Sequence, residues 1–163
     1  MINSSVSIIK MKTSSLDNIA CVSITTHNHG LFYIQQKDES YQIPTYRLKY
    51  TFFGGSAEKE ENPDDAILRE LREELIPKAV SLIVPHLKKL FHIKLLRTYL
   101  LPRKEYCLFH LYEAMLSDKN IQTLEKYTVK EGKCGIIFPR HKFSKLLFPE
   151  SLHPLIDRYR KFW

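Results

Sequence analysis

The chain has 163 residues, of which 44% are hydrophobic, and a formal net charge of +7. This length and composition predict one domain, residues 1–163, with its own core. No uncharged apolar stretch reaches the roughly 18 residues that a membrane span requires, and the first residues lack the layout of a signal peptide. Cys21, Cys107 and Cys134 are odd in number and widely spaced, which predicts reduced thiols and a cytoplasmic location rather than disulfides or a zinc site.

The charge is unevenly distributed along the chain. Eight acidic and three basic residues lie between Glu58 and Glu74, a local charge of −5, so the rest of the chain carries +12. A basic body around an acidic patch suits a polyphosphate substrate, because cations can hold the outer phosphate charges. The same excess could bind RNA or an acidic partner.

Hydrophobic patterning predicts strands and helices in mixed order. In chain order we expect strands at residues 19–26, 31–36 and 46–53, a helix from Pro63, a helical insert at about residues 77–90, strands at 91–101 and 106–115, a loop or short helix at 118–127, and a closing helix at 149–162. His27 and His29, in the turn between the first two strands, are expected to be structural or exposed.

The helix that starts at Pro63 has a well-defined beginning. Asn62 is a good N-cap, and Pro63 fits the first helical position because its missing N–H would be unpaired there. Asp64 and Asp65 follow in the first turn, where acidic side chains oppose the positive end of the helix dipole.

Two different faces are expected on this helix. One arc should face the core and holds Leu68, Leu71 and Leu75; a second arc holds three glutamates, Glu70, Glu73 and Glu74. Each like-charge pair at this spacing costs about 0.2–0.5 kcal/mol, which a hard divalent ion would remove. An ordinary solvated helix is the alternative, but it does not explain the whole spaced pattern. The sequence therefore predicts a metal site.

From Gly55 to Glu74 the chain reads G-x5-E-x7-R-E-U-x-E-E, where U is aliphatic, and resembles the Nudix box of MutT-like proteins. The preceding Thr51-Phe52-Phe53-Gly54-Gly55 is similar to the family's strand end, with Phe53 where proline is usual. The resemblance implies the Nudix fold, an α/β/α sandwich with a mixed central sheet. It also implies hydrolysis of a diphosphate linked to another moiety, with Mg²⁺ or possibly Mn²⁺ as cofactor.

The resemblance also implies roles for individual residues. The expected metal ligands are Glu70, Glu73, Glu74 and the backbone carbonyl of Gly54. The expected catalytic residues are Glu70, Glu73, Arg69, which orients the box carboxylates, and Glu131, which lies in a late loop where the family often places a base. The expected structural residues of the box are Gly55, Glu58 and Glu61, the last bracing the loop against the helix.

Two points in this pattern stay open. The base could instead be a box glutamate, Glu105 or Glu113, since the family does not place it at one point in the chain. After the box, Leu75-Ile76-Pro77 replaces the usual x-Gly-aliphatic, so the helix should end because Pro77 disfavours helical geometry at Ile76.

No residue is assigned to the substrate from the sequence. Aromatic side chains that could stack on a base or sugar are more often core residues at strand spacing; they are Tyr46, Tyr50, Phe52, Tyr106, Phe109 and Tyr112. Possible phosphate contacts are Arg47, Lys49, Arg97 and Arg103. The predicted function is metal-dependent hydrolysis of a pyrophosphate bond in a nucleoside triphosphate, nucleotide sugar or similar substrate. The alternative is a catalytically silent nucleotide- or RNA-binding module, whose usual mark, loss of box carboxylates, is absent.

Overall fold

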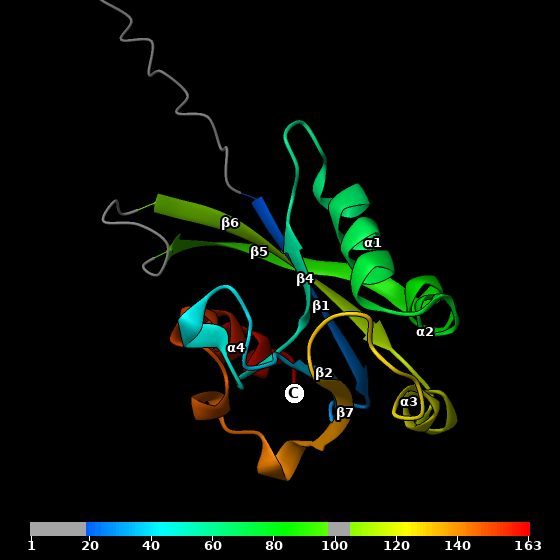
Figure 1. Ribbon diagram of the computed structural model, residues 1–163. Coiled ribbons are helices and arrows are strands. Elements are labelled where there is room, and N and C mark those ends of the chain that lie inside the picture. The colour runs from blue at the N-terminus through cyan, green and yellow to red at the C-terminus, as the bar shows by residue number, and fades with distance from the viewer. Residues whose placement is uncertain (1–18, 98–104) are drawn as a thin grey trace, which may run out of the picture.

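The computed structural model describes residues 19–97 and 105–163, and within them seven strands form one mixed sheet with helices on both faces (Figure 1). The strands are β1 (Ile19–His27), β2 (Leu31–Gln36), β3 (Tyr50–Thr51), β4 (Phe53–Ser56), β5 (Leu87–Arg97), β6 (Glu105–Met115) and β7 (Cys134–Pro139). The helices are α1 (Pro63–Glu74), α2 (Pro77–Ile83), α3 (Asp118–Leu124) and α4 (His153–Tyr159). The predicted α/β/α sandwich with a mixed central sheet is confirmed.

The strand order is β3-β2-β1-β6-β5, with β4 added beside β1 and β7 beside β2. Strands β1 and β6 are parallel, and every other described pair is antiparallel. Along one edge of β1 the first half pairs with β4 and the second half pairs with β2. The short strand β4 carries Gly54 and Gly55, so β1 fixes these glycines at the place where the chain leaves for α1.

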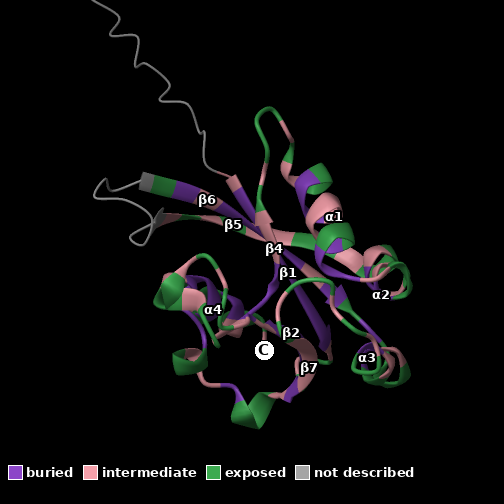
Figure 2. Ribbon diagram, viewed as in Figure 1, coloured by how far each residue is buried: buried purple, intermediate pink, exposed green. Residues whose placement is uncertain are grey.

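A separate hydrophobic cluster packs on each side of the sheet. Figure 2 shows that buried residues run along the central strands. The α1 side is closed by α1, α2 and α3, and the α4 side by aromatic residues of the C-terminal segment. Leu71 and Leu75 are fully buried as predicted, whereas Leu68 is only partly buried and Ile67 takes the central position. The buried face of α1 is therefore rotated toward Ile67, which also turns Glu74 inward.

The two ends of α1 follow the local signals in the sequence. The Asn62 side chain accepts hydrogen bonds from the backbone N–H groups of Asp64 and Asp65 at 3.0 and 2.9 Å. At the other end, Leu75 and Ile76 are extended, with ψ of 151° and 153°, and the next helix starts at residue 77. Leu75 then forms a β-bridge with Val129, which joins the end of the box to the loop that carries Glu131.

The helical insert predicted at about residues 77–90 is shorter in the structure. Helix α2 stops at Ile83, a 3-10 turn covers Val84–His86, and β5 begins at Leu87. Leu87 pairs with Ala114 of β6, so pairing with the neighbouring strand decides the structure of residues 87–90.

The predicted strand 46–53 and the closing helix 149–162 are also interrupted. Pro44 starts a 3-10 turn that ends at Tyr46, and Leu48 has a left-handed φ of 59°, so pairing with β2 begins only at Tyr50. Helix α4 is shorter than predicted and lies between two 3-10 turns. Residues 98–101 of the predicted strand 91–101 lie outside the described residues. No helix of the described part is long and apolar enough to cross a membrane.

The start of α1 is tied to the sheet by Tyr112 on β6, whose hydroxyl donates a hydrogen bond to the Asp64 carboxylate. This bond lowers the pKa of Asp64 below its ordinary value of 3.8. The contribution of this bond to the free energy of unfolding is therefore complete above about pH 4, and it is lost as the pH falls through the lowered pKa of Asp64. We expect Tyr112→Phe to reduce the free energy of unfolding by about 1 kcal/mol at pH 7.

Urea unfolding at pH 7 and pH 3 measures this effect, and the difference from wild type should shrink at pH 3. Tyr127→Phe is the control, because the Tyr127 hydroxyl has no hydrogen bond among the described residues and should change little. An equal loss at both pH values would show that the Tyr112 hydroxyl stabilises the fold independently of the charge on Asp64, and would contradict the prediction.

Candidate active site

Arg69 on α1 connects the box helix to the preceding loop. Its guanidinium donates a two-pronged pair of bonds to Glu61 at 3.0 and 2.9 Å and further bonds to Glu70 at 2.9 Å, Glu73 at 3.2 Å and the backbone carbonyl of Ser56 at 2.9 Å. Because the fork is planar and rigid, these contacts hold the two glutamates of α1 toward the same side.

Glu61 is fixed from two directions. Besides Arg69, its carboxylate accepts the backbone N–H of Glu58 at 2.8 Å. The bond from Arg69 is the main reason that the pKa of Glu61 is lowered. Glu61 therefore braces the loop against the helix. Glu58 contributes its backbone, and its exposed carboxylate has no partner among the described residues.

The two glycines of β4 allow the box carboxylates to approach the backbone closely. Gly54 has a φ of 128°, and a Cβ there would lie 2.1 Å from the carbonyl oxygen of Cys21. A Cβ on Gly55 would lie 2.5 Å from the carboxyl carbon of Glu70. The backbone N–H of Gly54 donates to the Glu74 carboxylate at 2.7 Å. A side chain at Gly55 would therefore displace the Glu70 carboxylate, and one at Gly54 would push β4, whose N–H binds Glu74, away from β1.

Glu74 is the buried member of the three glutamates, with 2% exposure. Its other carboxylate oxygen lies 3.0 Å from the ammonium of Lys37, which follows β2 and is 5% exposed. Burial raises the pKa of Glu74 to about 7, although Lys37 and the Gly54 N–H act in the opposite direction. Sequence reasoning missed Lys37, because a lysine after a strand carries no signal that it is buried.

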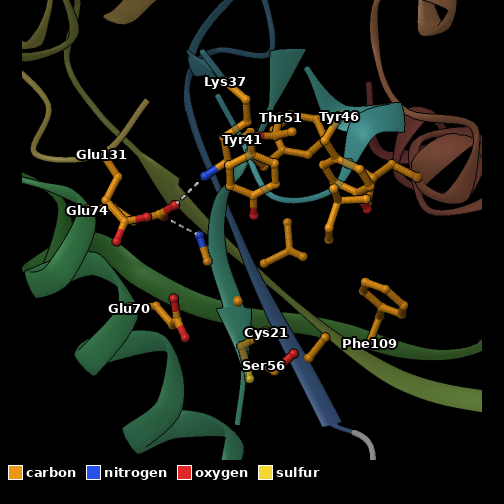
Figure 3. Close-up of a pocket in the computed structure, with 17 residues that line it drawn as sticks. Cys21, Lys37, Tyr41, Tyr46, Thr51, Ser56, Glu70, Glu74, Phe109 and Glu131 are labelled. Atoms are coloured by element: carbon orange, nitrogen blue, oxygen red, sulfur yellow. Dashed lines mark hydrogen bonds and ion pairs between the residues drawn. The ribbon is translucent and has the colours of Figure 1, made fainter. Parts of the chain in front are cut away.

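A cavity of about 310 Å³ lies beside the box. Its lining includes the acidic residues Glu70, Glu74 and Glu131 and the apolar or aromatic residues Tyr41, Ile43, Tyr46, Phe52, Phe109 and Leu152. Figure 3 shows the three carboxylates at one end, the polar end, and the rings of Tyr41, Tyr46 and Phe109 toward the other, the apolar end. Lys37 lies between the two ends (Figure 3). Glu73 does not line the cavity and has a half-exposed side chain.

Glu131 reaches this cavity from the loop before β7. The side-chain amide of Gln35 on β2 donates to its backbone carbonyl at 2.9 Å, and the backbone N–H of Lys130 donates to the carbonyl of Glu74 at 2.8 Å. The negative charge of Glu131 is one of the influences that raise the pKa of Glu70, although burial is the largest. Two carboxylates from distant segments therefore face one space.

The other candidates for the base lie elsewhere or outside the described side chains. Glu113 on β6 accepts hydrogen bonds from His29 at 2.8 Å and from the Tyr159 hydroxyl at 2.5 Å, and it does not line the cavity. The side chain of Glu105 is outside the described part. His27 hydrogen-bonds to the Leu116 carbonyl at 2.9 Å, and His29 bonds to Glu113. Both histidines are therefore structural, as predicted.

Among the six aromatic residues considered from the sequence, Tyr46, Phe52 and Phe109 line the cavity. The others do not: Tyr50 packs on Phe138, Tyr106 is exposed on β6, and Tyr112 bonds to Asp64. Sequence reasoning missed Tyr41, which lines the cavity from an irregular loop where no periodicity marks it. Arg47 is exposed and donates to the Tyr41 carbonyl, and Lys49 donates to the Leu146 carbonyl; neither side chain lines the cavity. Arg97 and Arg103 have no described side chain.

The donor set suits a hard divalent cation, which prefers carboxylate and carbonyl oxygens. Glu70, Glu74 and Glu131 border one cavity. However, no three acidic, histidine or cysteine side chains among the described residues form a ready-made metal site. Arg69 is paired with Glu70 and Glu73, and Lys37 with Glu74. The residues fit the ion once these carboxylates turn from the protein's own cations toward it.

Comparison with known proteins identifies the family and agrees with the fold. The family model for the NUDIX domain matches residues 15–157. Similar solved structures include a MutT protein from Methanosarcina mazei (13% identity, 89% of this chain and 94% of that one, TM-score 0.59) and a C. elegans Ap4A hydrolase (16%, 89% and 96%, TM-score 0.56). A MutT protein from Staphylococcus aureus shares 19% identity over 90% of this chain and 97% of that one, with a TM-score of 0.53. A search of curated proteins found no match.

The chain therefore belongs to the Nudix family. It is an enzyme, a pyrophosphohydrolase of the Nudix type, and it retains every carboxylate of the box. At 13–19% identity, the similarity to these solved structures shows a shared fold and does not identify the substrate. The substrate has to be inferred from the residues of this chain.

Proposed function

We propose that the protein hydrolyses a pyrophosphate bond in a nucleoside diphosphate-linked substrate, with Mg²⁺ or Mn²⁺ as cofactor. The observation that carries this proposal is the two-ended cavity, which has carboxylates at one end and aromatic and aliphatic side chains at the other. A molecule that joins a polyphosphate to a flat, apolar group matches both ends.

Glu70, Glu74 and the carbonyl of Gly54, which border the polar end, would hold the divalent ion together with Glu73, which lies outside the cavity lining on α1. When bound, such an ion offsets phosphate charge and lowers the pKa of a bound water. Arg69 bonds to both Glu70 and Glu73, so it keeps these two side chains on the same side of α1. Glu131 is placed to accept a proton from the attacking water, with a box glutamate as the other candidate.

At the apolar end, aromatic rings offer stacking surfaces. The rings of Tyr41 and Tyr46 are 6.1 Å apart at an interplanar angle of 33°, and Phe109 lies across the cavity from them (Figure 3). Stacking of a base on an aromatic side chain contributes about 1–3 kcal/mol and tolerates different bases. One protein of the same fold is described as an Ap4A hydrolase, which also supports a nucleotide-type substrate here.

A substrate panel with product analysis tests the proposal. The panel contains nucleoside triphosphates, nucleotide sugars, dinucleoside polyphosphates and inorganic triphosphate, each with Mg²⁺, with Mn²⁺ and with EDTA. We expect cleavage of at least one nucleotide substrate, reduced at least about 100-fold by EDTA, and slower cleavage of inorganic triphosphate. Binding without cleavage under every metal would instead identify a silent binding module.

We also propose that the enzyme works in the cytoplasm. Cys21, Cys107 and Cys134 are all free thiols, and the first two are buried, which suits a reducing compartment. Thiol titration of the denatured protein, purified without reductant under anaerobic conditions, should find three thiols. A disulfide in that material would contradict the assignment.

A further inference from the structure

The protein's own cations neutralise the three box glutamates in two different ways. Arg69 bonds to three carboxylates and a backbone carbonyl, so breaking one contact leaves the others in place. Lys37 has one carboxylate partner among the described residues, Glu74, and otherwise lies 4.8 Å from the centre of the Tyr41 ring. Of the two cations, Lys37 is therefore the one that can be released by breaking a single ion pair.

The position of this ion pair also matters. Both side chains are almost fully buried, and both line the cavity rather than the hydrophobic core. Figure 3 shows the Lys37 ammonium on the cavity side of Glu74, between the acidic and aromatic ends. A lysine has a flexible stem and three rotatable donors, so its ammonium can change partners without moving the backbone.

A divalent ion and Lys37 would compete for the same carboxylate. Among the described residues, the Glu74 carboxylate accepts hydrogen bonds from the Lys37 ammonium and the Gly54 N–H. An entering ion would meet a buried carboxylate oxygen already held by a cation. Once displaced, the ammonium would remain within the cavity that, under the proposed function, receives the phosphates.

We propose that Lys37 is the exchangeable counter-ion of Glu74: it neutralises this glutamate in the free protein, yields it to the divalent ion, and then binds a phosphate of the substrate. The phosphate half of this proposal rests on the proposed function. A purely structural ion pair makes a different prediction, because its removal would weaken metal binding and phosphate binding together.

Lys37→Met separates the two cases, since methionine fills similar space without charge. Electron paramagnetic resonance of Mn²⁺ with the substrate-free protein should show about 10-fold tighter binding, and calorimetry with imidodiphosphate in saturating Mn²⁺ should show about 10-fold weaker binding. Lys49→Met is the matched control, because it removes the same charge outside the cavity, and both affinities should stay within about 2-fold of wild type.

A double-mutant cycle with Glu74→Gln shows whether the effect acts through Glu74. In the Glu74→Gln background, Lys37→Met should change Mn²⁺ affinity less than about 3-fold. A 10-fold gain in both backgrounds would mean simple repulsion and would overturn the exchange. So would Mn²⁺ binding by Lys37→Met that is unchanged or weaker. Circular dichroism checks the fold, and Lys37→Gln replaces the methionine variant if that variant does not fold.

The outcome is separable from that of the proposed function. Mn²⁺ affinity is measured without turnover. If Lys37→Met binds Mn²⁺ more tightly but the wild-type protein cleaves no substrate, the proposed hydrolysis is refuted and the exchange at Glu74 is supported. If the wild-type protein cleaves nucleotides but Lys37→Met binds Mn²⁺ no more tightly, the proposed hydrolysis is supported and the exchange is refuted.

Discussion

Replacing Glu73 by glutamine is expected to reduce kcat by about 10²–10³-fold while the protein stays folded. Glu73 is the half-exposed glutamate of the box, and its described side-chain contact is a single 3.2 Å bond from Arg69. Exposed ion pairs contribute about 0–1 kcal/mol, so the free energy of unfolding should change by less than about 1 kcal/mol. Steady-state kinetics on a substrate from the panel and urea unfolding measure the two effects.

The control is Glu125→Gln, which removes an exposed carboxylate beyond α3 and should leave kcat unchanged. Raising the Mg²⁺ concentration should partly restore Glu73→Gln if the lost carboxylate binds metal. Full activity of Glu73→Gln would refute the assignment of Glu73 to the reaction.

Arg69→Met is expected to have the largest effect on stability, a loss of about 3 kcal/mol in the free energy of unfolding, together with a fall in kcat of at least about 100-fold. Removing the guanidinium leaves Glu61 and Glu70, both largely shielded from solvent, without their cation. It also frees the loop at Ser56 from the helix. Urea unfolding and kinetics report the two losses separately.

Two variants show whether the fork or only the charge of Arg69 matters. Arg69→Lys keeps the charge but cannot form the two-pronged pair with Glu61, so it should recover less than half of the lost stability. Arg72→Met removes an exposed arginine from the same helix, whose side chain has no hydrogen bond or ion pair among the described residues, and should cost less than about 0.5 kcal/mol. Equal losses for Arg69→Met and Arg72→Met would mean that Arg69 stabilises the fold no more than an ordinary surface charge.

The box was predictable because its signals are local. The cap at Asn62, the placement of Pro63 and the spacing of the three glutamates all depend on residues less than four turns apart, where helical geometry alone fixes which side chains share a face. The exact rotation of α1 about its axis could not be predicted from the sequence. Ile67 rather than Leu68 takes the centre of its buried face, because the shape of the sheet beneath selects which apolar side chain fits.

Segments between elements were predicted less well. Residues 87–90 have helix-compatible composition, yet pairing with β6 makes them a strand. Leu48 has a left-handed backbone, so the expected strand starts only at Tyr50, and the sequence does not mark this position with glycine or asparagine. In both places tertiary contacts outweigh a weak local preference.

By itself the sequence determined the family, the fold class and the carboxylate face of α1, since a spaced motif within one helix carries its own geometry. The tertiary structure decided what surrounds that face. Lys37 meets Glu74 across 37 residues, and Gln35 holds the backbone of Glu131 across 96. Such contacts depend on how β2, β4 and the loop before β7 are placed around one cavity, and strand pairing over long sequence separations is not encoded in any local pattern.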